Sequence, residues 1–330
     1  MMPKAIFLDR DGTLVFDPGY VHRIEDFKLQ ENTDKALKKI KGYLLFIVTN
    51  QSGIGRGIFS EEDMHKFNKL LIETLAKSGV SIEKIYFCPH KPEDNCKCRK
   101  PETMMIKEAT KDYSIDIKDS YMIGDDVCDI ELSSRVGCKG ILVLTGFGKK
   151  SLKEARMFSP HYISANLEQA CDFIMLQKPD KIIARKDIPS IVRKIRGEGK
   201  KIATLNGTFD ILHKGHSKII NEARKTADAL IVGINSDSSV KGNKGKERPF
   251  NSDTKRALML SVFKDIDYVT IFDEKTPIEM LEIIKPDVHV NGSEYGEECI
   301  EAETVRKNGG RICIVKLVPG FSTTDLVKER

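Results

Sequence analysis

The stretch FLDRDGT, residues 7–13, decides how the first half of this chain folds. It begins within an apolar run, residues 5–8, that is typical of a buried parallel strand. Asp9 therefore emerges at the carboxyl end of that strand, where open α/β sheets bind their ligands. Asp11 follows two residues later, and two converging carboxylates repel each other unless a cation such as Mg²⁺ lies between them.

These two carboxylates could carry out the hydrolysis of a phosphate ester. With a metal screening the ester, Asp9 is a candidate nucleophile towards phosphorus. Asp11 is a candidate acid that protonates the leaving alkoxide and later activates water. The alternative is a plain turn or a helix N-cap, because Asp-Gly is a common turn pair. The pair alone favours that alternative, so other motifs have to decide.

The composition is that of a soluble globular protein of about two domains. The 330 residues are 40% hydrophobic and 31% charged. The 54 basic residues are interleaved with 49 acidic ones, so nothing favours nucleic acid as a partner. The N-terminus shows no cleavable leader, and no run of about 18 apolar residues occurs. We therefore expect a cytoplasmic protein with no membrane partner.

Two later strand ends repeat the pattern. The apolar residues 43–48 deliver Thr49 and Asn50, which are candidates for hydrogen bonds to phosphate oxygens. The strand at residues 121–123 ends in GDDVCD, and Asp125 is placed there as Asp9 is in the first strand. Both carboxylates are therefore expected to reach one metal ion. Asp129 is left open, since it either joins them, supports the loop or caps the next helix.

The stretch CPHKPEDNCKCRKP, residues 88–101, predicts a zinc loop. Its two ligand pairs, separated by five residues, fit one closed tetrahedral and therefore structural Zn²⁺ site. The alternative is three unligated thiols and a chance histidine. Arg99 and Lys100 follow directly, and a rigid loop would hold their charges towards an anion. The four candidate zinc ligands are Cys88, His90, Cys96 and Cys98.

Strands alternate with helices along the whole chain, which predicts the α/β class with parallel, doubly wound, Rossmann-like sheets. The pattern breaks at QKPDK, residues 177–181. We therefore predict a first domain over residues 1–176, a linker with a leading helix over 177–199, and a second domain over 200–330.

The motifs FLDRDGT, TNQSG, CRKP and GDDVCD, in this order, resemble those of the haloacid dehalogenase superfamily of phosphatases. The cysteine loop makes the chain similar to the branch that holds heptose bisphosphate and histidinol phosphatases. This resemblance covers residues 7–144 and implies both the fold and the reaction type.

The resemblance also implies roles for individual residues. It makes Asp9 the nucleophile and Asp11 the general acid and base. It implies that the side chains of Asp9 and Asp125 and the backbone carbonyl of Asp11 hold Mg²⁺. One departure is Asp126, where phosphatases of this branch often carry a lysine. The implied substrate contacts are Thr49, Arg99 and Lys100, of which Lys100 also belongs to the catalytic set.

The second half contains a phosphate site of its own. Residues 201–205 read as a buried strand, and NGTFDILHKGH, residues 206–216, follows. Gly207 permits close approach of a ligand, and the start of the next helix offers free N–H groups. His213 and His216 lie three apart on one helical face and can donate to phosphates. A core pair or a zinc pair are the alternatives, and a third metal ligand is not evident nearby.

GTFDILHKGH, a Lys-rich loop VKGNKGKERP (residues 240–249), VNGSEY and GFSTT together resemble the cytidylyltransferase-like nucleotidyltransferases over residues 201–328. Within that family, this half is similar to the adenylyltransferase domain of the bifunctional ADP-heptose synthases. The resemblance implies that a sugar 1-phosphate attacks the α-phosphorus of ATP, with Mg²⁺ on the triphosphate and both histidines stabilising the transition state. The implied nucleotide-binding residues are Asn206, Gly207, Thr208, Phe209, His213, His216, Lys244, Arg248, Ser322, Thr323 and Thr324.

Together the two halves imply consecutive steps of ADP-heptose synthesis, with a sugar phosphate and ATP as the partners. A first alternative joins a histidinol-phosphate-type phosphatase to a glycerol-phosphate or pantetheine-phosphate nucleotidyltransferase. A second alternative is a nucleotide-binding sensor without turnover. The sequence leaves open the sugar anomer, ATP against CTP or GTP as donor, channelling between the sites and a homo-oligomer.

Overall fold

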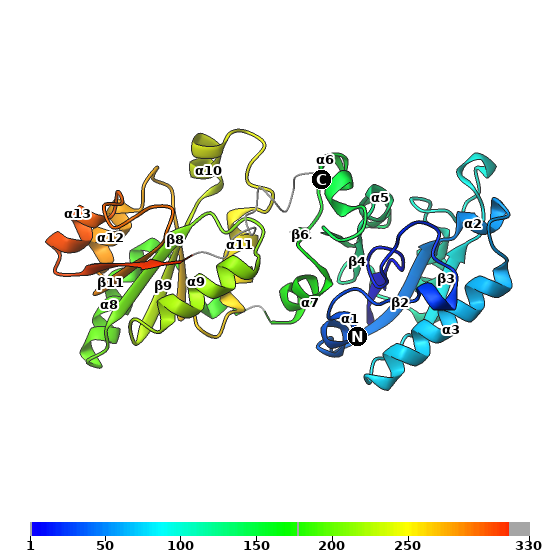
Figure 1. The fold of residues 1–330 in the computed structure, drawn as a ribbon, viewed down its shortest axis with the longest axis horizontal. Helices are drawn as coiled ribbons and strands as arrows, with labels where there is room; N and C mark the ends of the chain where they lie inside the picture. The colour runs from blue at the N-terminus through cyan, green and yellow to red at the C-terminus, as the bar shows by residue number, and fades with distance from the viewer. Residues whose placement is uncertain (1, 177, 317–330) are drawn as a thin grey trace. The chain divides into compact units, whose positions relative to one another are not determined.

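The computed structural model describes residues 2–176 and 178–316. The chain divides into two compact units between Met175 and Leu176 (Figure 1). Each unit holds one six-stranded sheet in which every pair of neighbouring strands is parallel. The predicted α/β class with two doubly wound sheets is therefore confirmed. No helix in the described ranges is long and apolar enough to cross a membrane.

The first sheet has the strand order β3-β2-β1-β4-β5-β6, with β1 near its centre. Residues 5–8 of β1 are fully buried, because helices cover both faces of the sheet. The strand order reverses at β1, since β2 lies on one side and β4 on the other, and such a reversal opens a crevice at the carboxyl ends. The strands are β1 (Lys4–Leu8), β2 (Tyr43–Asn50), β3 (Lys84–Cys88), β4 (Tyr121–Gly124), β5 (Lys139–Val143) and β6 (Tyr162–Ser164).

Helices complete the first unit. Helix α3 begins after Ser60, which forms a capping box with Asp63. On one face of the sheet, α4 and α5 pack on a core that includes Phe7, Phe46 and Met122. The helices are α1 (Thr33–Lys38), α2 (Ser52–Gly55), α3 (Glu61–Lys77), α4 (Met104–Tyr113), α5 (Val127–Val136), α6 (Gly148–Ala155) and α7 (Leu167–Met175), with short 3₁₀ turns at Ile24–Asp26, Pro92–Asp94 and Arg156–Phe158.

The second sheet repeats this plan around β8, with the strand order β12-β11-β8-β9-β10-β7. Its order reverses at β8, which lies between β9 and β11, so the carboxyl end of β8 is the expected ligand site. The strands are β7 (Ile182–Ile183), β8 (Ile202–Gly207), β9 (Ala229–Asn235), β10 (Tyr268–Phe272), β11 (Val288–Gly292) and β12 (Arg311–Val315).

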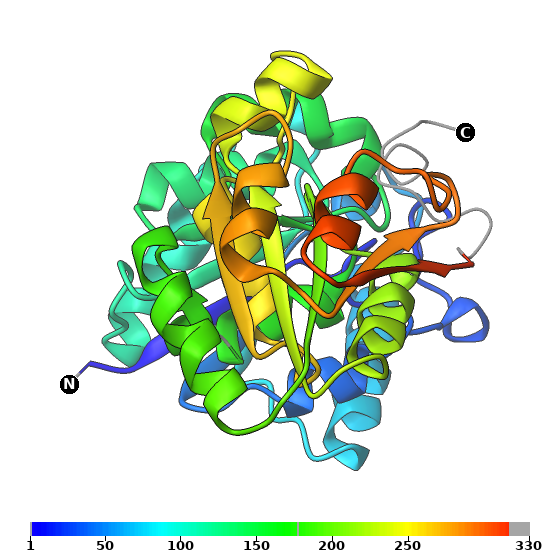
Figure 2. The same cartoon turned by 90° about the vertical axis from the view of Figure 1, so that its left-hand side faces the viewer.

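The helices α8, α12 and α13 cover one face of this sheet and lie in front of it in Figure 2. The segment 177–199, expected to be a linker with a leading helix, is largely part of the second unit. Its residues 182–183 pair with β10, and Ile188, Val192 and Ile195 of α8 are buried in the core. The helices are α8 (Ile188–Gly197), α9 (Lys214–Arg224), α10 (Asp237–Lys244), α11 (Asp253–Ser261), α12 (Ile278–Ile284) and α13 (Ala302–Lys307), with 3₁₀ turns at Pro179–Lys181 and Arg185–Asp187.

The Lys-rich segment is only partly a loop. Residues 240–244, expected to be flexible, form the second half of α10, because Ser236 accepts a hydrogen bond from the backbone N–H of Ser239 and so caps the helix start. The helix ends before Gly245, whose φ of 89° suits glycine. The irregular part is therefore residues 245–252.

Candidate active sites

The carboxyl ends of β1, β2 and β4 surround a cavity of about 380 Å³ in the first unit. Residues from five different segments line it, which is what the strand-end argument predicts for a doubly wound sheet. The structure thus brings together the residues that the sequence placed at one site: Asp9, Asp11, Thr49, Asn50, Arg99, Lys100 and Asp125.

A cluster of buried charges lies at the bottom of this cavity. Carboxylate oxygens of Asp9, Asp125 and Asp129 all lie within 4.8 Å of one another. The Nζ atom of Lys100 lies 2.6 Å from Asp9 Oδ1 and 2.6 Å from Asp129 Oδ1. None of the four residues is more than 7% exposed, so solvent does little to screen these charges.

Burial and like charge dominate the electrostatics of the cluster. Burial raises the pKa of Asp9 to about 7; Lys100 opposes this rise, and Asp129 adds to it. Burial, with the charges of Asp9 and Asp129, raises the pKa of Asp125 well above its usual range. Burial alone would lower the pKa of Lys100. The negative charges of Asp129 and Asp9 outweigh this effect and hold the Lys100 pKa well above its usual value. One lysine thus balances three converging carboxylates only in part.

This donor set fits a divalent cation. Three converging carboxylates with hard oxygen ligands suit Mg²⁺, and a bound ion would relieve their mutual repulsion. Asp125 is already oriented, because its Oδ1 accepts from Thr13 Oγ1 at 3.1 Å and its Oδ2 from the backbone N–H of Phe147 at 2.7 Å. Gly12 is required beside it, since a Cβ atom there would lie 2.2 Å from Asp125 Oδ2 and its φ is +80°.

Asp129 is a member of the cluster that the sequence left open. It contacts Lys100, and its Oδ2 also accepts from the backbone N–H of Asp126 in the capping box at the start of α5. Asp129 therefore takes part in capping α5, as its spacing suggested, and it also belongs to the buried charge cluster. Asp126 lines the cavity and caps α5 through a 3.0 Å bond from the backbone N–H of Cys128.

Asn50 has a second contact, with the backbone of Lys100. Its side-chain Oδ1 accepts from the backbone N–H of Lys100 at 2.9 Å, and its Nδ2 donates to the Lys100 carbonyl at 3.2 Å. The amide of Asn50 thus supports the backbone at Lys100. Because Asn50 also lines the cavity, its contact with a phosphate stays a prediction. The hydroxyl of Thr49 accepts a hydrogen bond from Gln51 and keeps its own proton for a ligand.

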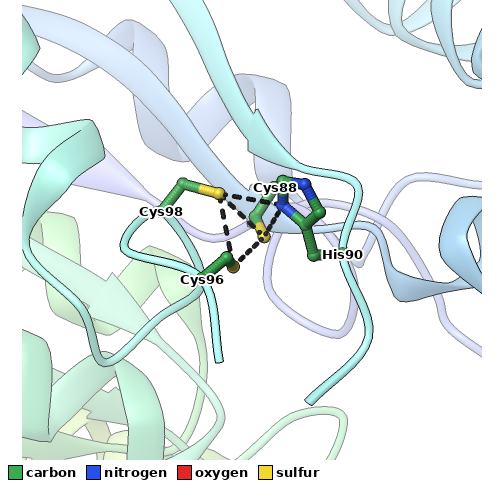
Figure 3. Close-up of side chains that lie close together, drawn as sticks. All are labelled: Cys88, His90, Cys96 and Cys98. Atoms are coloured by element: carbon green, nitrogen blue, oxygen red, sulfur yellow. Dashed lines mark hydrogen bonds between the residues drawn. The ribbon is translucent and has the colours of Figure 1, made fainter. Parts of the chain in front are cut away.

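The Cys/His loop gathers its four candidate ligands at one point (Figure 3). Cys98 Sγ lies 3.2 Å from Cys88 Sγ and 3.5 Å from Cys96 Sγ, and His90 Nδ1 lies 3.2 Å from Cys98 Sγ. Four soft donors this close fit one tetrahedral Zn²⁺, whose Zn–S bonds are about 2.3 Å long. The loop also carries Arg99, whose Nη1 donates to the His90 carbonyl at 3.3 Å.

We expect Cys96→Ser to remove the metal from this loop. A hydroxyl is a poor zinc ligand, and the segment has little apolar content with which to fold alone. Elemental analysis should find one zinc per wild-type chain and less than about 0.2 in the variant, with the thermal midpoint of the first unit lowered by several degrees. Cys138→Ser, outside the cluster, is the matched control. Metal-free wild-type protein that stays folded and active would refute a structural role.

In the second unit, His213 and His216 stack at the start of α9, with ring centroids 3.8 Å apart. His216 Nδ1 accepts the backbone N–H of His213 at 3.3 Å, which leaves the ring proton on Nε2. Burial lowers the pKa of His216 to about 3, and the neighbouring His213 and Lys244 act in the same direction. His216 is therefore a neutral imidazole with one ring N–H, on Nε2, that can donate to a ligand.

The Lys-rich segment is tied to the GTFD loop through Asp210. Arg248 Nη1 lies 3.0 Å from Asp210 Oδ2, and the backbone N–H of Phe250 donates to the same carboxylate at 2.9 Å. Because Lys244 lowers the pKa of His216, its charge acts on the histidine pair. The structure thus ties Arg248 to the GTFD loop, which lies just before the two histidines in the chain.

The remaining nucleotide-binding candidates fall into two groups. Asn206 and Gly207 end β8, and Phe209 packs against His216 with ring centroids 5.2 Å apart. Thr208 accepts a 2.6 Å hydrogen bond from buried Arg256 at its carbonyl. Three candidates, Ser322, Thr323 and Thr324, lie outside the described residues.

Comparisons with known proteins agree with both units. A model of the cytidylyltransferase-like family matches residues 204–327, and a model of the HAD-hydrolase-like family matches residues 97–170. The Bifunctional protein HldE of Wolinella succinogenes is 41% identical over 154 residues, which are 46% of this chain and 32% of that protein. This chain therefore spans about a third of that relative's length.

Phosphatases are among the other matches. A solved structure, D,D-heptose 1,7-bisphosphate phosphatase from B. bronchiseptica complexed with magnesium and phosphate, is 28% identical with a TM-score of 0.49, over 51% of this chain and 96% of that chain. The D-glycero-beta-D-manno-heptose-1,7-bisphosphate 7-phosphatase of Haemophilus ducreyi is 47% identical over 156 residues, which are 44% of this chain and 86% of that protein. The chain thus belongs to the family of the heptose-1,7-bisphosphate 7-phosphatases and carries a cytidylyltransferase-like domain in its second half.

Proposed function

We propose that this chain carries out two consecutive steps of ADP-heptose synthesis. The first unit removes the 7-phosphate of D-glycero-D-manno-heptose 1,7-bisphosphate, and the second transfers AMP from ATP to the resulting heptose 1-phosphate with release of pyrophosphate. The observation that carries the proposal is the buried cluster of Asp9, Lys100, Asp125 and Asp129, in a chain that also holds a nucleotidyltransferase-like unit.

In the first unit, an oxygen of Asp9 attacks phosphorus while the bond from phosphorus to the sugar oxygen breaks. Asp11 donates its proton to that oxygen, and Lys100 holds the phosphoryl oxygens. Asp11, now ionised, takes a proton from water, which attacks phosphorus and frees Asp9. Asp9 and Asp125, with the backbone carbonyl of Asp11, would hold Mg²⁺, which would screen the charge of the phosphate.

In the second unit, a phosphate oxygen of heptose 1-phosphate forms a bond to the α-phosphorus of ATP, and the bond to pyrophosphate breaks. Charge builds up on the oxygens around that phosphorus. The Nε2–H of His216 donates to these oxygens, while Lys244 and Arg248 hold the triphosphate. The hydroxyls at residues 322–324 are proposed as further phosphate contacts, and Mg²⁺ accompanies the nucleotide.

A panel of phosphate esters tests the substrate of the first unit. Phosphate release from heptose 1,7-bisphosphate, heptose 1-phosphate, histidinol phosphate and glycerol 3-phosphate is measured with Mg²⁺ at equal concentrations. The proposal predicts the highest kcat/KM for the bisphosphate. Preference for histidinol phosphate would contradict the proposed substrate while leaving the phosphatase chemistry intact.

A further inference from the structure

Arg10, between the two aspartates of FLDRDGT, is one of the largest fully buried side chains of the protein, with 1% exposure. A buried guanidinium is costly unless its N–H groups are paired. Arg10 forms a two-pronged pair with Asp11, in which Nε lies 2.8 Å from Oδ1 and Nη2 lies 2.9 Å from Oδ2. The carboxylate of Asp11 is therefore held at both oxygens by one rigid planar group.

The guanidinium is itself fixed from other segments. Its Nη1 donates to Asn68 Oδ1 of α3 at 2.9 Å, and its Nη2 lies 3.0 Å from the carbonyl of Val21. The ring of Phe67, also on α3, lies 4.9 Å from the guanidinium carbon. Arg10 therefore connects Asp11 to a helix and to the loop that follows β1, and it has little freedom to move.

Gln51 holds the same carboxylate from a second strand end. Its Nε2 donates to Asp11 Oδ2 at 2.7 Å and to Thr49 Oγ1 at 2.8 Å, and its Oε1 accepts from Arg10 at 3.0 Å. Both residues line the cavity, but Gln51 is only 3% exposed, whereas the side chain of Asp11 is 21% exposed. Arg10 and Gln51 thus bind Asp11 from its buried side and leave its exposed side towards the cavity.

We infer that Arg10 and Gln51 are positioning residues for the proton transfers of Asp11. A general acid contributes only when its oxygen lies within hydrogen-bond distance of the leaving oxygen. An Asp side chain rotates about its single bonds unless neighbouring residues hold it. Arg10 is not among the residues that line the cavity, whereas Gln51 lines it beside Asp11. The role inferred for both residues passes through Asp11. This inference rests on the proposed phosphatase function of the first unit.

The leaving group separates this role from a merely structural one. A sugar alkoxide needs a proton as it departs, whereas 4-nitrophenolate leaves as a stable anion. The ratio kcat/KM covers the steps up to release of the alcohol, so it isolates the proton donation of Asp11 from the later hydrolysis. It is measured for heptose 1,7-bisphosphate and for 4-nitrophenyl phosphate.

We expect Arg10→Gln to lower kcat/KM by about 100-fold for the sugar phosphate and by less than about fivefold for the aryl phosphate. Gln51→Glu keeps the size of the side chain and an acceptor for Arg10, but replaces the donor to Asp11, and we expect the same selective loss. In the background of Asp11→Asn, neither substitution should lower activity further, because its effect passes through Asp11. Arg135→Gln, which alters a 41% exposed arginine of the same unit, is the control and should change either value by less than about twofold.

The positioning role would be overturned if Arg10→Gln and Gln51→Glu lowered kcat/KM equally for both esters. It would also be overturned if either substitution lowered activity further in the Asp11→Asn background. If Arg10→Gln does not fold, Gln51→Glu decides by the same two criteria. Wild-type protein that hydrolyses neither ester would instead overturn the proposed phosphatase, and the inference with it.

Discussion

Asp9→Asn is expected to lower phosphate release by about 10⁴-fold or more while AMP transfer stays within about twofold of the wild type. The amide has the shape of the carboxylate, so it fits beside Lys100, whose Nζ lies 2.6 Å from Asp9 Oδ1. It is no nucleophile towards phosphorus, and it also removes one of the converging negative charges that suit a cation. Phosphate and pyrophosphate release are measured separately on the same preparation.

The control for this change is Asp119→Asn, an aspartate of the same unit that is 62% exposed and pairs with Lys139. It should leave phosphate release within about twofold. Mass spectrometry of the quenched wild-type reaction should find one added phosphoryl group on the peptide that contains Asp9. Activity of Asp9→Asn above about one hundredth of the wild type would place the nucleophile elsewhere.

The second large effect is expected from His216→Ala, which should lower pyrophosphate release by about 10²- to 10³-fold and leave phosphate release largely intact. The substitution removes a donor whose proton is fixed on Nε2 by the bond to the His213 backbone. Because the pKa of His216 is lowered to about 3, the ring takes up a proton only far below neutral pH. AMP transfer should therefore show no loss near pH 6.5, where an unperturbed histidine titrates.

His65→Ala is the control for this change, since His65 lies on α3 of the first unit and its side chain is 59% exposed. It should leave pyrophosphate release unchanged. If His216→Ala lowered phosphate release and pyrophosphate release together, the proposal of two independent sites would be contradicted. A loss of AMP transfer centred near pH 6.5 in the wild type would contradict the neutral donor.

Strand ends made the first site predictable from sequence. Asp9 and Asp125 each follow a short apolar run, and parallel strands bring their carboxyl ends to one edge of a sheet. The zinc-loop residues were predictable for a different reason, because four soft ligands lie within eleven residues. Helix capping also follows from local sequence, as the start of α3 at Ser60 shows.

Residues that act through long-range contacts were not predictable. Nothing in the local sequence singles out Arg10, and only the fold brings Asn68, 58 positions later, within 2.9 Å of it. The contact of Asn50 with the backbone of Lys100, 50 positions later, likewise depends on the fold. The two-residue strand β7 has no periodicity to detect, since its identity comes from pairing with β10.

The most direct test of the two-step account is incubation of the wild-type chain with heptose 1,7-bisphosphate, Mg²⁺ and each of ATP, CTP and GTP in turn, with the products identified by mass. The account predicts heptose monophosphate and free phosphate in every mixture, and ADP-heptose with pyrophosphate where ATP is present. A nucleotide sugar that retains the 7-phosphate, or no nucleotide sugar with any of the three donors, would contradict it.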